Sequence, residues 1–150
     1  MKKILFTILL AIGAFANSLT IGDNIPNLTI NDQFEKVHTI KADTKTILFS
    51  ATKAESETIK VFLESKDKGF LEKNNIQYIA DITGMPSIIS KFFALPKMKK
   101  YDFSILLIDE KNKDLFSVKE EKITVYTFKD SKVSDIKYIS TKEELESIFK

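Results

Sequence analysis

One continuous stretch decides the fold of this chain, and it reads Thr46-Ile47-Leu48-Phe49-Ser50-Ala51-Thr52-Lys53-Ala54-Glu55-Ser56-Glu57. The unbroken apolar run from Ile47 to Phe49 is typical of a strand that is covered on both faces of a largely parallel sheet. Thr52 and Glu55 have the spacing of a capping box, which begins a helix. Apolar residues then recur on one helical face at Ile59, Phe62 and Leu63. The stretch therefore predicts a buried strand that runs directly into the N-terminus of a helix.

The segment Phe49 to Glu57 resembles the redox segment of a known family. It is similar to the FWATWCxxC segment of TlpA-type periplasmic thioredoxins, and in that alignment the two family cysteines fall on Ala54 and Glu57. The resemblance implies a site in which a thiolate at a helix N-terminus carries the chemistry. Because the chain has no cysteine at any position, thiol–disulfide exchange and thiol peroxidase activity are excluded.

The first sixteen residues have the pattern of a signal peptide. Lys2 and Lys3 form a basic start, residues 4–12 are apolar except for Thr7, and Ala14-Phe15-Ala16 matches a cleavage site. We expect residues 1–16 to be removed after Ala16 and residues 17–150 to act in the periplasm as a single domain. The alternative is an uncleaved anchor, but the apolar run is short for a spanning helix.

The charge balance of the mature chain argues against a nucleic-acid partner. Without Lys2 and Lys3, the 23 basic residues become 21, which equals the number of acidic residues. All of these basic residues are lysine, and no clustered basic face is evident in the sequence. The absence of cysteine also means that an exported form would have no structural disulfide.

The region from Leu19 to Ile40 predicts a leading β-hairpin. Leu28-Thr29-Ile30 and Val37-His38-Thr39-Ile40 flank a polar turn that contains Asp32 and Gln33. The pattern resembles the N-terminal hairpin of peroxiredoxins and TlpA-type proteins. His38 is the one histidine of the chain. It could serve as a base or a metal ligand, but we interpret it as a structural or solvent-facing residue.

The middle of the chain predicts a strand followed by a helix. Residues 76–82 form the first strand, and Asp81 near its end is either a site acid or a loop-capping residue, the interpretation we favour. A helix then begins near Pro86 and ends at Pro96. Its inward face is predicted to consist of Ile88, Ile89, Phe92 and Phe93. The following cluster of Lys97, Lys99 and Lys100 is either a contact for an acidic partner or a solvated turn.

The C-terminal part predicts a strand over residues 104–108, a hairpin over residues 123–139 and a final helix capped near Ser140-Thr141. This ending resembles the second half of a thioredoxin domain. The span from Leu106 to Leu145 is similar to the YtfJ-like family of exported thioredoxin-fold proteins. The thioredoxin family also has a cis-proline before the strand that faces the active helix. That position falls near Ser104 or near Lys122-Ile123, and neither place holds proline.

Together these patterns predict an α/β protein with a thioredoxin-like three-layer fold. We expect a central mixed sheet, an N-terminal β-hairpin and flanking helices. The contact surface is predicted on the face that carries the redox site in the family. Its residues are Ser50, Thr52, Lys53, Glu55 and Ser104.

The function we expect is a non-catalytic binding or assembly module for a periplasmic protein or peptide. The alternatives are an enzyme with non-thiol chemistry and a small-ligand site on the same face. Ser50 or Ser104 would need a base in reach to act as a nucleophile. The sequence holds no G-x-S-x-G, P-loop or dinucleotide motif. We therefore expect no catalytic residue, no metal and no cofactor.

Overall fold

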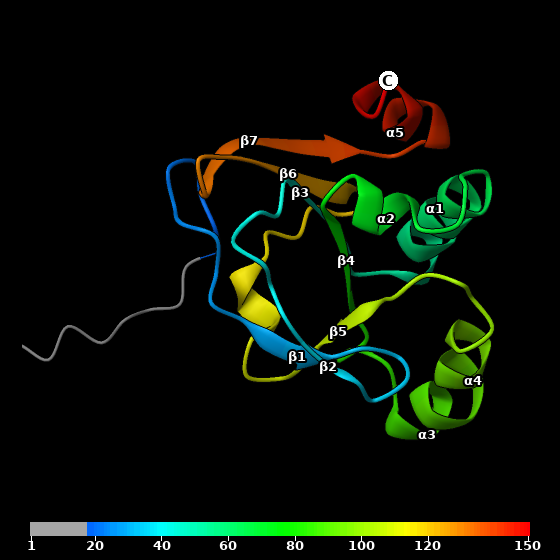
Figure 1. Ribbon diagram of the computed structural model, residues 1–150. Helices are drawn as coiled ribbons and strands as arrows, with labels where there is room; N and C mark the ends of the chain where they lie inside the picture. The colour runs from blue at the N-terminus through cyan, green and yellow to red at the C-terminus, as the bar shows by residue number, and fades with distance from the viewer. Residues whose placement is uncertain (1–17) are drawn as a thin grey trace, which may run out of the picture.

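The structure, a computed structural model, describes residues 18–150. A five-stranded mixed sheet lies at its centre in the order β5-β4-β3-β6-β7, and a two-stranded hairpin precedes it (Figure 1). The predicted signal peptide, residues 1–16, lies outside the described residues. The strands are β1 (Thr29–Asn31), β2 (Val37–Thr39), β3 (Thr46–Ser50), β4 (Ile76–Asp81), β5 (Leu106–Ile108), β6 (Ile123–Lys129) and β7 (Lys132–Ile139).

Short helical segments connect these strands. The α-helices are α1 (Lys53–Glu64), α2 (Phe70–Lys73), α3 (Ser87–Ile89), α4 (Leu95–Met98) and α5 (Lys142–Ile148). A π-helical segment, η1 (Ser90–Ala94), joins α3 to α4, and a 3-10 turn, η2 (Lys113–Leu115), follows β5. The long α1 helix lies over one face of the sheet near α5 (Figure 1).

Strand β3 is the centre of the sheet, and all five of its residues are buried. It pairs in parallel with β4 and antiparallel with β6, and β5 extends the parallel half. Alternate side chains of a strand point to opposite faces. Leu48 therefore packs toward α1 and α5, whereas Ile47 and Phe49 pack toward the hairpin side.

Two buried clusters fill the two sides of the sheet. The helix side contains Ile59, Phe62, Leu63, Leu71 and Leu145. The other side contains Leu19, Leu28, Ile30, Ile40 and Phe116. Helices, sheet and hairpin thus form three layers, and the predicted central mixed sheet with an N-terminal hairpin and flanking helices is confirmed. Residues 18–150 thus contain a buried core on each side of the sheet.

The predicted helix from Pro86 to Pro96 differs from the structure in two ways. Its apolar stripe was predicted to face inward, but Ile88, Ile89, Phe92 and Phe93 are exposed. Pro96 was predicted to end the helix, but the helical segment continues to Met98.

Both corrections have one physical cause, the π-helical turn in η1. There the Leu95 amide donates to the carbonyl oxygen of Ser90, five residues earlier. The extra residue in this turn shifts the preceding side chains out of register with Leu95 and Met98, which pack against the core. It also changes the bonding pattern just before Pro96, which has no amide hydrogen to donate.

Hydrogen bonds from the turn of the hairpin connect it to the sheet. The side chain of Gln33 is buried, and its Nε2 donates to the carbonyl oxygens of Phe103 at 2.7 Å and Met98 at 3.4 Å. Its Oε1 accepts from the Ile105 amide at 2.8 Å. The Gln33 side chain therefore both donates to and accepts from the backbone just before β5, as a neighbouring strand would.

The neighbouring Asp32 gives His38 a structural role. Asp32 Oδ2 and His38 Nε2 are 2.6 Å apart, and Asp32 Oδ1 accepts from the amides of Phe34 and Lys36. Burial raises the pKa of Asp32, but the hydrogen bonds from His38 and from these two amides together lower it below the ordinary value. The charged carboxylate thus holds the turn together.

We predict that the stabilising effect of Asp32 is lost in acid. A carboxyl group with a lowered folded pKa stabilises the protein above its unfolded pKa, near 3.8, and this stabilisation disappears as pH falls through the folded pKa. The free energy of unfolding of wild type should therefore exceed that of Asp32→Asn at neutral pH, and the difference should shrink below about pH 4. Urea denaturation of both proteins across this range measures it. A difference that stays constant would contradict the prediction.

Candidate functional site

The predicted strand-to-helix junction is present, and a capping box begins α1 at Thr52. Thr52 Oγ1 accepts from the Glu55 amide at 3.3 Å, and Glu55 Oε2 accepts from the amides of Ala51 at 2.7 Å and Thr52 at 3.3 Å. Glu55 is only 4% exposed. Its carboxylate serves the helix cap and is not available on the surface, although the sequence placed it among the contact residues.

Ser50 lies beneath this junction and is completely buried. Its Oγ is 2.9 Å from Ser56 Oγ and 3.3 Å from the Tyr78 hydroxyl. Burial raises the pKa of Tyr78, so its phenol stays protonated near neutral pH and cannot act as a base for Ser50. His38 is engaged with Asp32 in the hairpin. The three hydroxyl groups therefore form a structural hydrogen-bonded cluster without the base that a serine nucleophile needs.

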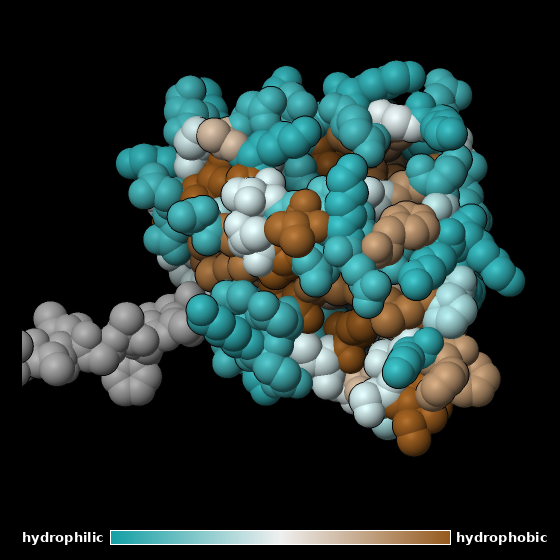
Figure 2. All heavy atoms as spheres, turned by 60° about the horizontal axis from the view of Figure 1, so that its bottom comes forward, coloured by the Kyte–Doolittle hydropathy of each residue, from teal (hydrophilic) through white to brown (hydrophobic). Residues whose placement is uncertain are grey.

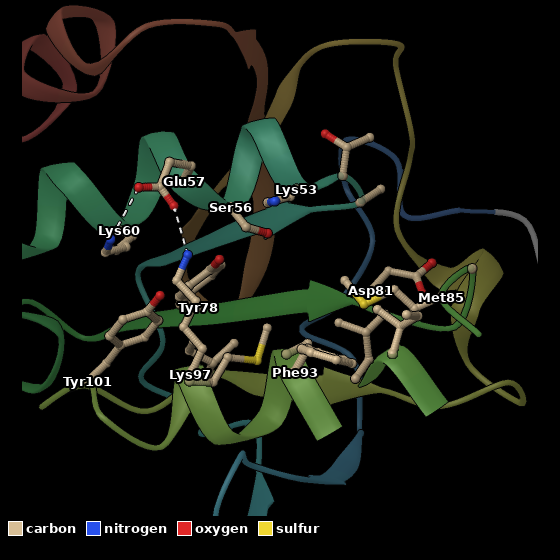
Figure 3. A pocket seen from close by; sticks show the side chains of 18 of the residues that line it. Lys53, Ser56, Glu57, Lys60, Tyr78, Asp81, Met85, Phe93, Lys97 and Tyr101 are labelled. Carbon is tan, nitrogen blue, oxygen red and sulfur yellow. Dashed lines mark hydrogen bonds and ion pairs between the residues drawn. The ribbon is translucent and has the colours of Figure 1, made fainter. Parts of the chain in front are cut away.

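A pocket of about 540 Å³ opens beside the start of α1. One wall is α1, the other is the segment from α3 to α4, and β4 forms the floor (Figure 3). Apolar side chains make up most of its interior: Ile82, Met85, Ile89, Phe93, Met98 and Phe103. Polar residues of the junction, Thr52, Lys53 and Ser56, line the end near α1.

Charged side chains connect the two walls. Glu57 on α1 lies 3.1 Å from Lys60 Nζ and 3.6 Å from Lys97 Nζ on α4, and Figure 3 shows both ion pairs. The hydrogen bond from Lys60 lowers the pKa of Glu57, partial burial opposes this, and the nearby charge of Lys97 adds to the lowering. Lys53, at the same mouth, makes no ion pair within residues 18–150. The pocket thus combines an apolar interior with a rim rich in lysine.

The structure brings together part of the predicted contact surface. Thr52 and Lys53 line the pocket, and Ser50 lies below it. Ser104 lies elsewhere, because it precedes β5 and faces the side of the sheet opposite to its neighbours Phe103 and Ile105. It lines a separate hollow with His38 and Leu106.

Other pocket residues were not identified from the sequence. Glu57, Tyr78 and Tyr101 line the pocket, as does Lys97, which the sequence placed only in a basic cluster. Asp81 also lines it, but its Oδ1 accepts from the amide and hydroxyl of Thr83 at 2.8 and 2.6 Å. That is the loop-capping role favoured from the sequence. The alternation of strand β4 could have placed Tyr78 on the helix side; no sequence pattern indicated that α4 would come to face α1.

Two further observations bear on the kind of site. Within residues 18–150, no three side chains of the types His, Cys, Asp and Glu are grouped in a way that could hold a metal ion. In the same part of the chain, no helix has both the length and the apolar character needed to cross a membrane.

No protein-family model matches the chain, and no curated protein matches it. Solved structures do match. The thioredoxin domain of a thiol-disulfide oxidoreductase from Bacteroides vulgatus has 16% identity and a TM-score of 0.57, with coverage of 89% of this chain and 100% of that one. The fold is thioredoxin-like.

Two other structures give the same result. A protein described as the thiol:disulfide interchange protein DsbE from Chlorobium tepidum has 17% identity and a TM-score of 0.59, over 88% of this chain and 96% of its own. A peroxiredoxin-like protein from Aquifex aeolicus has 12% identity and a TM-score of 0.53, over 87% and 86%. At these identities the likeness concerns the fold.

The sequence placed the family's cis-proline position near Ser104 or near Lys122-Ile123. Ser104 precedes β5, and Lys122-Ile123 lie at the start of β6, the strand antiparallel to β3. Among the described residues no peptide bond is cis.

Proposed function

We propose that this protein is an exported, redox-inactive thioredoxin-fold module that binds an apolar segment of a periplasmic protein or peptide. The bound segment would lie in the pocket between α1 and α4. One observation carries the proposal: a largely apolar pocket of about 540 Å³ lies at the helix N-terminus where redox relatives carry their cysteines. This volume is within the usual range for ligand sites, and an apolar interior with few polar groups is typical of them.

The chemistry of the rim describes the partner further. Lys53, Lys60 and Lys97 surround the mouth, and Glu57 already pairs with the last two. An apolar side chain of the partner would enter the pocket, and an acidic group beside it would meet Lys53. Because exposed ion pairs add little affinity, the apolar contact would supply most of the binding energy. The lysines of the rim would orient the partner.

Export and the narrower family relationship belong to the same proposal. The basic start, apolar run and Ala14-Phe15-Ala16 site support secretion. The Phe49–Glu57 segment supports a relation to TlpA-type thioredoxins, and the Leu106–Leu145 span supports one to the YtfJ-like family. N-terminal sequencing of the protein from a periplasmic fraction tests export. A mature start at Asn17 is the expected result, and protein retained with Met1 in the cytoplasm would contradict it.

We predict that filling the pocket weakens binding. Ala94 lines the pocket, whereas Ala54 is exposed on α1 outside it. Ala94→Trp should therefore weaken binding of the apolar anionic dye anilinonaphthalene sulfonate by about tenfold or more, and Ala54→Trp should not. The same pair of variants, used as baits for affinity capture from periplasmic extract, tests the natural partner.

The outcomes distinguish the candidate functions. A protein or peptide captured by wild type and by Ala54→Trp but not by Ala94→Trp supports the binding module. A small molecule released from the wild-type protein with the same dependence would favour the small-ligand alternative. Equal capture by wild type, Ala54→Trp and Ala94→Trp would show that the partner binds outside the pocket.

A further inference from the structure

The segment that forms the outer wall of the pocket has an unusual composition. From Ile82 to Tyr101 there is no acidic residue, while there are four lysines, at 91, 97, 99 and 100. The mature chain as a whole has equal numbers of acidic and basic residues. The positive charge of this segment is therefore a local property and not a reflection of net charge.

The same segment exposes large apolar side chains. Ile88 is 66%, Phe92 is 63% and Phe93 is 67% exposed, and Ile89 follows at 44%. Ile88 and Phe92 lie outside the pocket, whereas Ile89 and Phe93 also line it. Figure 2 shows apolar surface on the side where α3 and α4 lie. Exposed apolar surface of this kind is typical of a site that binds a protein or a membrane.

Three of the four lysines of this segment, Lys91, Lys99 and Lys100, make no ion pair within residues 18–150 and could meet such a partner. All four are exposed. Lys91 Nζ lies 5.8 Å from the centre of the Phe92 ring, so a charged and an apolar group stand side by side. The hairpin turn adds Phe34, 49% exposed, next to Gln33, which is bonded to the Met98 carbonyl of α4.

We propose that the segment from Ser87 to Lys100 docks the protein on an anionic membrane surface. Helical segments with exposed phenylalanine and isoleucine beside lysine bind at the lipid–water boundary, where the apolar side chains enter the acyl region. The lysines then lie at the level of the phosphate groups, with their stems along the apolar surface. A protein partner fits less well, because lysine is depleted at the core of protein interfaces.

Vesicle flotation of residues 17–150 tests the proposal. The N-terminal residues are left out because the apolar run of residues 4–12 would itself enter lipid, and the described core lies within the remaining chain. Wild type should bind vesicles of mixed phosphatidylglycerol and phosphatidylcholine, and should bind pure phosphatidylcholine only weakly. Binding should decrease as salt is raised, because salt screens the lysine–phosphate attraction.

Two sets of substitutions identify the surface. Ile88→Ser with Phe92→Ser should weaken binding by about tenfold or more. Lys91→Gln, Lys99→Gln and Lys100→Gln together should weaken it on the order of 100-fold, from about fivefold for each lysine. The matched controls are Val118→Ser, at an apolar residue 58% exposed elsewhere, and the combined changes Lys41→Gln, Lys68→Gln and Lys129→Gln. Both controls should bind as wild type does.

Several results would overturn the proposal. They are no binding to anionic vesicles, binding that survives the Ile88 and Phe92 changes, and equal loss in the matched lysine control. If wild type does not bind vesicles but captures a protein, and this capture is lost in Ile88→Ser with Phe92→Ser, the surface docks a protein instead. Because Ile88 and Phe92 do not line the pocket, this proposal and the pocket proposal can fail separately.

Discussion

Replacing Glu55 with lysine is expected to lower the free energy of unfolding by about 3 kcal/mol. The Glu55 carboxylate accepts from the Ala51 and Thr52 amides at the start of α1, and the side chain is buried. Lysine would leave both amides without this acceptor and would place a positive charge at the positive end of the helix dipole. Chemical denaturation of the two proteins measures the change.

Glu57→Lys is the matched control for this prediction. Glu57 lies two residues further along α1, and its side chain is 48% exposed. Its ion pairs with Lys60 and Lys97 are at the surface, where such pairs contribute little to stability. The denaturation midpoint of Glu57→Lys should therefore stay close to that of wild type. Equal effects of the two substitutions would contradict the assignment of Glu55 as a buried cap.

Replacing Gln33 with leucine is expected to destabilise the protein by about 3 kcal/mol. Leucine has a similar size but cannot replace the hydrogen bonds with the Phe103 carbonyl oxygen and the Ile105 amide. These backbone groups would be left without their partner beside β5. Since Met98, Phe103 and Ile105 also line the pocket, the same substitution should loosen the pocket wall and weaken dye binding.

Gln77→Leu provides the comparison for Gln33. Gln77 lies on β4, is partly buried, and makes no side-chain hydrogen bond with any described residue. Its replacement should change the unfolding midpoint little. Hydrogen exchange at the Ile105 amide gives a local readout, which should become faster in Gln33→Leu and stay unchanged in Gln77→Leu. Slow exchange in both would show that the Gln33 side chain does not hold this strand.

The two proposals divide the α3–α4 segment between two roles. Phe93, Ala94 and Met98 line the pocket, whereas Ile88 and Phe92 project from its outer side. One helical segment would thus place a pocket for an apolar partner next to a membrane surface. A thioredoxin-like scaffold without cysteine would then serve as a site of assembly rather than of electron transfer.

The sequence by itself determined the layers of the fold and the start of α1. Apolar runs and capping pairs are local patterns, and residues such as Thr52 with Glu55 act over a single helical turn. The unbroken apolar run from Ile47 to Phe49 was enough to predict a strand covered on both faces of the sheet, and the lack of cysteine excluded thiol chemistry without any structure.

The tertiary structure alone decided where the candidate site lies. The pairing of Glu57 with Lys97 joins helices that are separated in sequence by strand β4, and the single-residue shift in η1 accompanies the outward position of Ile88 and Phe92. Burial likewise separated Glu55 from Glu57, although both lie in the first turns of the same helix. These features depend on how distant elements pack against one another. Helical periodicity assumes a regular, isolated helix, so it predicts neither a π-helical turn nor contacts between distant helices.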